Sequence, residues 1–171
     1  LVGVSIDVVM PMALGTSLGA IVITSSSAAL AHHRNKNIPW QLAGPLMIVV
    51  GVGALLGAFI ADILSTKALT NFFSVVVILL ACYMLMSISV TKARKMPPIK
   101  VVKFFSFITG IISSLMGIAG GAILVPMLSY FGLPLRHGIG IATACGVMVA
   151  LFGSLGYIIT GFNLSTIPEW S

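Results

Sequence analysis

Long uncharged stretches alternate along the chain with short segments that hold nearly all of its charged residues. A helix needs about 20 residues to cross a bilayer, at a rise of about 1.5 Å per residue. Five stretches approach or exceed that length, at roughly residues 8–31, 42–61, 68–90, 104–130 and 138–161. The pattern therefore predicts an all-α fold: a polytopic transmembrane helical bundle with about five membrane spans.

The fourth stretch does not fit one straight helix. The uncharged run that contains it extends from Phe104 to Leu135 and is too long for one simple span, and Gly117, Gly120 and Gly121 lower the helix propensity near its centre. Pro126 lacks the N–H group that a continuing helix would use. We therefore expect a broken helix near residues 117–126. Backbone that leaves a helix at membrane depth must be buried in protein or line a polar cavity, which makes this break the first candidate for a transport site.

Composition agrees with a membrane protein and excludes several other classes. Hydrophobic residues make up 58% of the chain and charged residues 7%, and the mean hydropathy is +1.17. The excess of Lys and Arg lies in the loops, with no aromatic-studded basic face, so we expect the lipid bilayer and not nucleic acid as partner. The few ionisable groups are scattered over different loops, and Cys82 and Cys145 lie within apolar stretches. We therefore predict no catalytic residue, no metal site, no cofactor and no enzyme activity.

The loop charges predict an orientation. If each stretch crosses the membrane once, segments 32–40 and 92–103 share one side with seven Lys and Arg residues, against Lys67 and Arg136 on the other. The positive-inside rule then places both segments in the cytoplasm, below a cell (inner) membrane. A re-entrant segment 104–130 would reverse the side of everything after it, and this alternative stays open.

A weak internal repeat predicts two related halves. One constant shift along the chain aligns Thr16 with Thr143 and Gly19 with Gly146. The expected parts are residues 1–91 as the end of a first membrane repeat, 92–103 as a basic cytoplasmic linker, and 104–171 as the start of a second repeat. Because the loops after the matched stretches fall on the same expected side, the two repeats are expected to be parallel in orientation and not inverted.

The break also predicts a kind of chemistry. A helix that restarts after Gly121 would point free N–H groups and the positive end of its dipole at the gap, which favours an anion without any buried Lys or Arg. Hydroxyl groups from the matched stretches would complete the site. The candidate substrate-binding residues are Gly117, Gly120, Gly121, Thr16, Ser17 and Thr143. Two alternatives stay open: the glycines only allow close helix packing, and the hydroxyls only bond to carbonyls of their own helix.

These motifs carry a family resemblance. They are Gly117-Ile118-Ala119-Gly120-Gly121, Val125-Pro126, Gly132-Leu133-Pro134 and Ala142-Thr143, with residues 13–18 and 29–32 in the first half. Over essentially its whole length, the chain resembles the TauE/SafE family of membrane transporters, the sulfite-exporter family. The resemblance implies a multi-pass inner-membrane or plasma-membrane protein with two related halves that moves small sulfur-containing or organic anions. It also implies that the chain lacks the first span and the last two.

Two departures from the family pattern leave the substrate open. The family commonly has a third glycine where this chain has Ala119, and a serine where it has Ala144. We predict a secondary transporter, expected to be an exporter, of a small anion; the sulfite, sulfonate or organosulfur class is what the resemblance implies. A non-transporting membrane scaffold or assembly subunit and an anion channel are the alternatives, and homo-oligomer formation stays open.

Overall fold

The structure is a computed structural model that describes residues 6–87 and 96–161. Within those ranges it contains six helices and no strand, which confirms the all-α prediction. The helices are α1 (Ile6–Arg34), α2 (Trp40–Ile63), α3 (Thr66–Ser87), α4 (Ile99–Met116), α5 (Gly121–Tyr130) and α6 (Leu135–Gly161). All except α5 are long and apolar enough to cross a membrane, so five candidate spans are confirmed.

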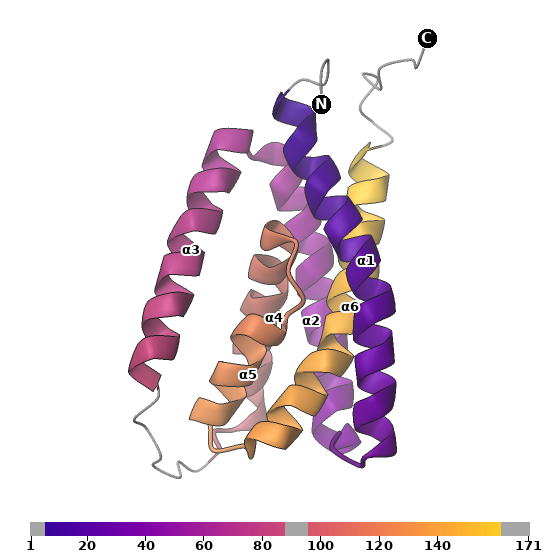
Figure 1. Cartoon of the computed structure of the whole chain (residues 1–171), viewed down its shortest axis with the longest axis vertical. Helices are drawn as coiled ribbons and strands as arrows, with labels where there is room; N and C mark the ends of the chain where they lie inside the picture. Colours follow the sequence, from indigo (N-terminus) through magenta and orange to yellow (C-terminus); the bar gives the residue numbers. More distant parts are fainter. Residues whose placement is uncertain (1–5, 88–95, 162–171) are drawn as a thin grey trace.

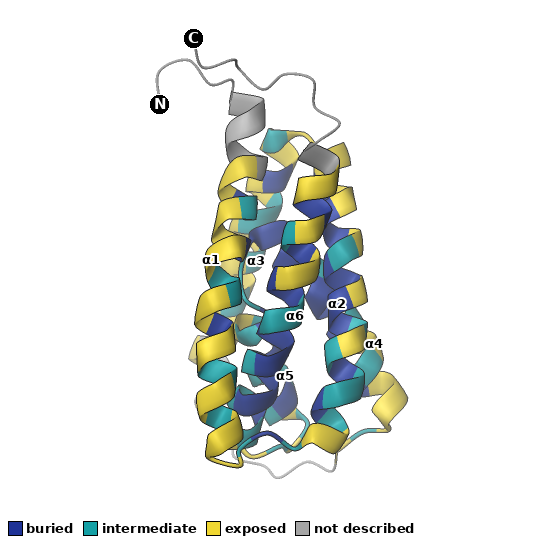
Figure 2. Cartoon of the chain, turned by 90° about the vertical axis from the view of Figure 1, so that its right-hand side faces the viewer, coloured by how far each residue is buried: buried dark blue, intermediate teal, exposed yellow. Residues whose placement is uncertain are grey.

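Helices α1, α2, α4 and α6 form the packed part of the bundle (Figure 1). Helix α2 packs against both α4 and α6, and α1 packs against α6. Figure 2 shows that buried residues follow the inner faces of α2 and α6, while most of α1 is exposed. Leu46, Val50 and Ala54 of α2 are completely buried, at the spacing that keeps residues on one helix face.

Small residues let these helices approach closely. A Cβ atom at Gly110 of α4 would overlap the backbone carbonyl of Val50 in α2, and one at Gly53 would overlap the carbonyl of Phe107. A Cβ at Gly156 of α6 would lie 2.5 Å from the Cβ of Ala58. Backbones in contact across small residues are typical of helices packed within a membrane.

Helix α3 stands apart from this core (Figure 1). Among its side chains that the structure describes, only Leu69 is buried. The rest of the helix therefore presents apolar side chains outward, as expected of a span that faces lipid or further protein.

Helices α4 and α5 form a hairpin that enters the bundle and turns back. Helix α4 runs beside α2 until Ser114 lies against Gly57, where a Cβ on the glycine would be 3.0 Å from that of the serine. After the turn, α5 returns beside α6, with Gly121 next to Ala142 and Leu128 next to Gly138. The start of α4 and the end of α5 therefore lie at the same end of the molecule (Figure 1).

The hairpin corrects the expected topology. The predicted break in the helix is confirmed and spans residues 117–120. It does not extend to Pro126, which lies inside α5. Segment 104–130 does not cross the bundle once; it is the re-entrant alternative. A Cβ at Gly140 would lie 3.2 Å from Ile38 Cγ1, so α6 begins at the end where α1 meets α2.

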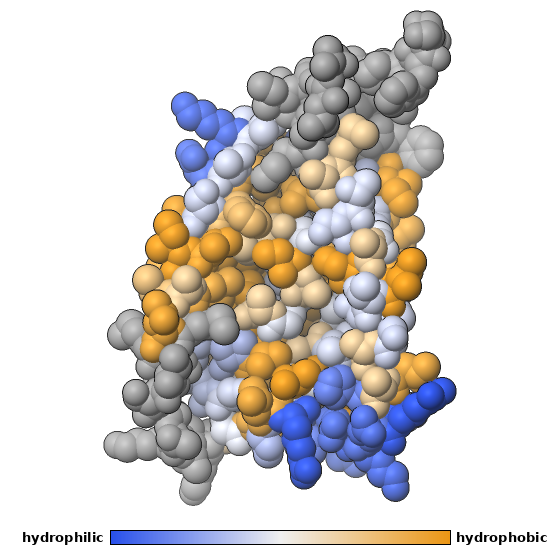
Figure 3. All heavy atoms as spheres, viewed as in Figure 1, coloured by the Kyte–Doolittle hydropathy of each residue, from blue (hydrophilic) through white to orange (hydrophobic). Residues whose placement is uncertain are grey.

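As a consequence, the described Lys and Arg residues are concentrated at one end of the molecule more strongly than the sequence predicted. We call the end formed by residues 35–39, the start of α4 and the start of α6 the basic end; Figure 3 shows hydrophilic residues gathered there. Arg136 lies at this end and not opposite it, because α5 brings the chain back. Of the described Lys and Arg residues, only Lys67 lies at the far end. Residues 92–95 of the expected linker fall outside the described residues.

The expected orientation of the repeats is wrong. Helices α1 and α6 hold the matched stretches, and they run in opposite directions, since Leu18 packs against Gly153 and Ser25 against Gly146. A repeat that relates α1 to α6 must therefore be inverted. The cause is again the hairpin, which adds no crossing between the two stretches. The division into repeats at residues 1–91 and 104–171 stays a prediction, and residues 162–171 lie outside the described residues.

Candidate substrate site at the helix break

The turn between α4 and α5 depends on glycine. Gly117 ends α4 in the left-handed conformation, with φ of 62°, and its N–H group donates to the Ser114 carbonyl at 3.2 Å. The N–H group of Ile118 donates to the Ser113 carbonyl at 3.0 Å. These bonds satisfy the last carbonyls of α4 in the manner of a left-handed helix cap. A Cβ at Gly117 would lie 2.8 Å from Leu14 Cδ2, so the position excludes larger residues.

Two side chains from other helices hold this turn in place. The Ser17 hydroxyl of α1 donates to the Gly117 carbonyl at 2.8 Å. The Tyr157 hydroxyl of α6 donates to the Ser114 carbonyl at 3.1 Å, within the protein interior. The turn is therefore fixed from two sides, and the start of α5 has a defined position.

A small cavity of about 140 Å³ lies beside the turn. It is bounded by α1, the turn, α5 and α6, and its lining consists of Ser25, Ala119, Gly121, Val125, Ile139, Ala142 and Thr143. No charged residue lines it, and its polar side chains are the hydroxyls of Ser25 and Thr143. Ser25 approaches the α6 backbone closely, since a Cβ at Gly146 would lie 3.1 Å from its Oγ.

The start of α5 has no side-chain cap and lies near a buried hydroxyl without a partner. The N–H groups of Ile123 and Leu124 both point back to the Gly120 carbonyl, at 3.3 and 2.8 Å, and no side chain caps the helix. The hydroxyl of Ser113 is 99% buried and has no hydrogen-bond partner in the described part of the chain. It lies 3.7 Å from the position that a Cβ on Gly120 would occupy. Orphan donors at a helix start carry the positive end of the helix dipole, and such a place favours an anion.

The structure brings only some of the predicted site residues together. Gly121 and Thr143 line the cavity, although the Thr143 hydroxyl bonds to the Gly140 carbonyl of its own helix at 2.9 Å. Gly120 is not among the lining residues; a Cβ there would lie 3.5 Å from Val149 Cγ2 and 3.7 Å from Ser113 Oγ. Gly117 and Ser17 form the turn and its anchor, outside the cavity lining.

Thr16 lies elsewhere. Its side chain is exposed, and its hydroxyl donates to the Met12 and Ala13 carbonyls one turn back in α1. This is the local bonding that the sequence favours for most hydroxyls in membrane helices. The same pattern holds for Thr24, which bonds to Ala20 and Ile21.

The candidate residues predicted from the sequence include neither Ser25 nor Ser113. Ser25 lies within the run of hydroxyl residues 24–27, where local bonding is the usual outcome. Ser113 lies one turn before the break. The available signal was spacing: Ser25 is eight residues after Ser17, so both lie near one face of α1.

Within the described residues no three His, Cys, Asp or Glu side chains come together as metal ligands. The fold and the site therefore define a class: a multi-pass helical membrane protein with a re-entrant helical hairpin whose turn borders a small, uncharged cavity.

The chain belongs to the sulfite exporter TauE/SafE family, whose model matches residues 1–168. This confirms the resemblance seen in the motifs. The chain is 30% identical to a probable membrane transporter protein of Haemophilus influenzae, over 100% of this chain and 65% of that protein. It is 23% identical to the probable membrane transporter protein YunE of Bacillus subtilis, over 95% of this chain and 68% of that protein.

A third relative is a probable membrane transporter protein of Methanocaldococcus jannaschii, 26% identical over 85% of this chain and 55% of that protein. The chain thus spans between about half and two thirds of the length of these curated relatives. No solved structure matches the chain.

Proposed function

We propose that this chain forms part of a secondary transporter for a small anion, and that the anion binds at the start of α5. The observation that supports this most directly is the pairing of an uncapped helix start with the buried, unpartnered hydroxyl of Ser113. Gly121 and Thr143 contribute to the cavity, and Ser25 adds a hydroxyl. Gly117 and Ser17 position the helix start, and Thr16 has no part in the site.

The kind of site limits the substrate. A cavity of about 140 Å³ has room for a few heavy atoms, and neither Lys nor Arg lines it. Binding through N–H groups and hydroxyls suits a small oxyanion, whose several acceptor oxygens can be shared among separate donors. The family's description supports an anion of the sulfite, sulfonate or organosulfur class, and export is the direction that it suggests.

The proposed setting follows from the charge distribution. Of the described Lys and Arg residues, Arg34, Lys36, Lys100, Lys103 and Arg136 lie at the basic end. The positive-inside rule therefore favours the basic end, with loops 32–40 and 92–103, on the cytoplasmic side of the cell (inner) membrane. We propose no enzymatic step, because transport through the hairpin requires binding and movement only.

Transport by the complete protein in proteoliposomes tests the site. Gly121→Leu places a large side chain in the cavity and is expected to lower anion flux to background, whereas Gly121→Ala should keep most of it, because a Cβ there would lie 3.9 Å from Ala142. Gly44→Leu is the matched control, since a Cβ at Gly44 meets nothing within 4 Å. Normal anion flux with Gly121→Leu in a folded, membrane-inserted protein would show that the anion does not bind in this cavity.

The same assay separates the remaining classes. A transporter gives flux that saturates with anion concentration and follows an imposed ion gradient. Absence of flux in the folded wild-type protein would favour a scaffold or assembly subunit, and flux that rises linearly with anion concentration would favour a channel. Ser113→Ala and Ser25→Ala should each weaken anion binding about tenfold or more, since a hydrogen bond to a charged group contributes about 1.5–3 kcal/mol.

A further inference from the structure

The small cavity beside the helix break extends along α6. Three neighbouring pairs mark successive turns of that helix: Ala119 with Gly146, Gly121 with Ala142, and Val125 with Gly138. Gly138 belongs to the first turn of α6, which lies at the basic end. The Val125 end of the cavity therefore lies nearer the basic end, and the Ala119 end lies deeper in the bundle.

Hydrogen-bond donors belong to the deeper end of the cavity. The N–H groups of a helix point toward its start, so the first N–H groups of α5, from Gly121 onward, are directed at this end. The Ser25 hydroxyl belongs to the same end, because a Cβ at Gly146 would lie 3.1 Å from its Oγ. We call this the donor end of the cavity.

The side chains that line the other end of the cavity are aliphatic. They belong to Val125 of α5 and Ile139 of α6, and we call this part the apolar end. Thr143 lies between the two ends, and its hydroxyl already donates its one proton to the Gly140 carbonyl at 2.9 Å. The two ends of the cavity therefore differ in the chemistry that they can bind.

This division favours an anion that has one polar and one apolar part. An oxyanion bound at the donor end leaves the rest of the molecule at the apolar end. A further oxygen there would give up its water without gaining a donor, whereas a hydrocarbon group is stabilised by leaving water. Among the described residues that line the cavity there is no Lys, Arg or His, so none of them compensates a second negative charge.

The volume of the cavity sets the size of the apolar part. The cavity measures about 140 Å³, and a protein cavity of about 150 Å³ holds one benzene molecule. Ethanesulfonate has as many heavy atoms as benzene. Building on the proposed anion site, we propose that the substrate is a singly charged oxyanion with an apolar substituent of about two carbons, and not an inorganic oxyanion. Val125 and Ile139 hold the apolar substituent.

Calorimetric titration of the complete protein in detergent tests this substrate class with sulfate, methanesulfonate, ethanesulfonate and butanesulfonate. Methanesulfonate should bind more tightly than sulfate, which has an oxygen and a second charge in place of the methyl group. Ethanesulfonate should bind about fourfold more tightly again, which is the factor for one buried CH₂ group. Butanesulfonate exceeds the cavity and should bind more weakly than ethanesulfonate. Gly121→Leu should abolish binding of all four anions, because its side chain fills the cavity.

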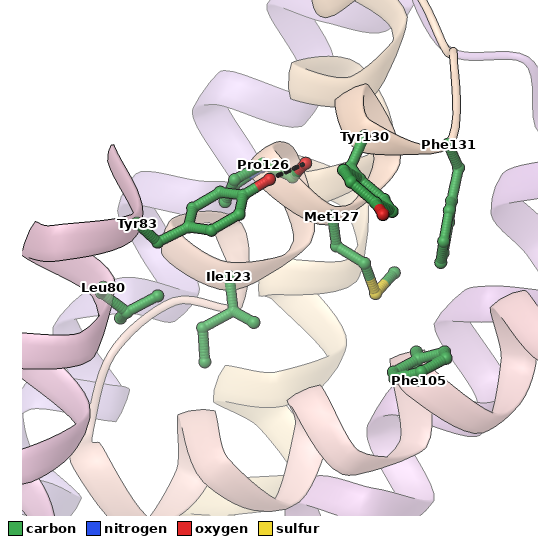
Figure 4. Close-up of a pocket in the computed structure, with 8 residues that line it drawn as sticks. All are labelled: Leu80, Tyr83, Phe105, Ile123, Pro126, Met127, Tyr130 and Phe131. Carbon is green, nitrogen blue, oxygen red and sulfur yellow. Dashed lines mark hydrogen bonds between the residues drawn. The ribbon is translucent and has the colours of Figure 1, made fainter. Parts of the chain in front are cut away.

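Two variants enlarge the apolar end, Val125→Ala and Ile139→Ala. Each should bind butanesulfonate more tightly than ethanesulfonate, which reverses the wild-type order. Ile123→Ala is the matched control, because Ile123 lies two residues from Val125 and about 200° around α5. Ile123 lines a different cavity, an apolar groove of about 320 Å³ between α3, α4 and α5 (Figure 4), so this variant should keep the wild-type order.

The results distinguish this inference from the proposed function on which it rests. If sulfate binds as tightly as ethanesulfonate, or if both enlarged variants keep the wild-type order, the apolar end does not hold the substrate, while the anion site stands. If none of these anions binds to the folded protein, the proposed function fails and this inference fails with it. Binding that persists in folded Gly121→Leu protein would place the anion outside the cavity and overturn both.

Discussion

At the scale of single residues, the helix break is held by contacts that only particular side chains can make. Gly117 adopts a left-handed conformation against Leu14, and its carbonyl accepts the Ser17 hydroxyl. Tyr157 fixes the preceding turn through Ser114. The position of the α5 start thus depends on three residues from three helices, of which only Gly117 belongs to the break itself.

Gly117→Ala should destabilise the protein. A non-glycine residue in the left-handed region costs about 1–2 kcal/mol, and the new Cβ would also press on Leu14. Thermal unfolding in detergent should show a lower midpoint than wild type, while Gly44→Ala, which meets no neighbour, should unfold at or above the wild-type midpoint. An unchanged midpoint for Gly117→Ala would mean that the turn adopts another conformation.

The adjacent hydroxyls of α1 allow a matched comparison. Ser17→Ala removes the bond to the Gly117 carbonyl and should cost about 1 kcal/mol of stability, with weaker anion binding because the α5 start loses an anchor. Thr16→Ala removes only a bond within its own helix and should change neither quantity measurably. A larger loss of anion binding for Thr16→Ala than for Ser17→Ala would show that Thr16 contributes to the anion site.

This pair also shows where sequence reasoning stops at the residue scale. The position of a hydroxyl residue in the sequence gives its depth along a helix, and Thr16 and Ser17 lie at nearly the same depth. They point about 100° apart around the axis, at about 3.6 residues per turn, so one reaches the turn and the other faces outward. Direction depends on which neighbours pack against the helix, and a single sequence does not contain that information.

At the scale of elements, the hairpin of α4 and α5 decides the architecture. Glycine content and an excess of length were enough to predict that the helix breaks, because both are local properties. They were not enough to predict reversal. Reversal requires α6 to offer a face for the returning α5, and that face comprises Gly138 and Ala142 from a later segment. The start of α4 at Ile99 was also missed, because Lys100 and Lys103 lie within its first two turns, whereas counting charges assigns both to the linker.

Close packing of α2 with α4 should be required for the hairpin to stay in place. In Gly110→Ala, the new methyl group would overlap the Val50 carbonyl, and overpacking of this kind costs about 1–3 kcal/mol. The variant should unfold at a lower temperature and lose anion binding, since α4 carries Ser113. Gly19→Ala, where a Cβ meets nothing within 4 Å, is the control at an exposed position. Wild-type stability of Gly110→Ala would contradict the observed helix contact.

At the scale of the whole molecule, the reversal of the chain at the hairpin explains why most of the described Lys and Arg residues lie at one end. Because segment 99–130 begins and ends at the basic end, Arg136 joins Arg34, Lys36 and the lysines of α4 there. Charge counting from the sequence could give the preferred side of the first loops, but the side of α6 depended on the hairpin. The same reversal places α5 between a small cavity with two hydroxyls and an apolar groove.

Thiol accessibility from one side of the membrane tests the re-entrant hairpin most directly. In the complete protein with Cys82 and Cys145 replaced by alanine, single cysteines are introduced as Asn35→Cys, Ser65→Cys and Leu135→Cys. They are labelled with a membrane-impermeant reagent in intact cells and in inverted vesicles. The hairpin predicts that positions 35 and 135 react from the same side and position 65 from the other. Reaction of position 135 together with position 65 would show that residues 99–130 cross the membrane, and would contradict the account.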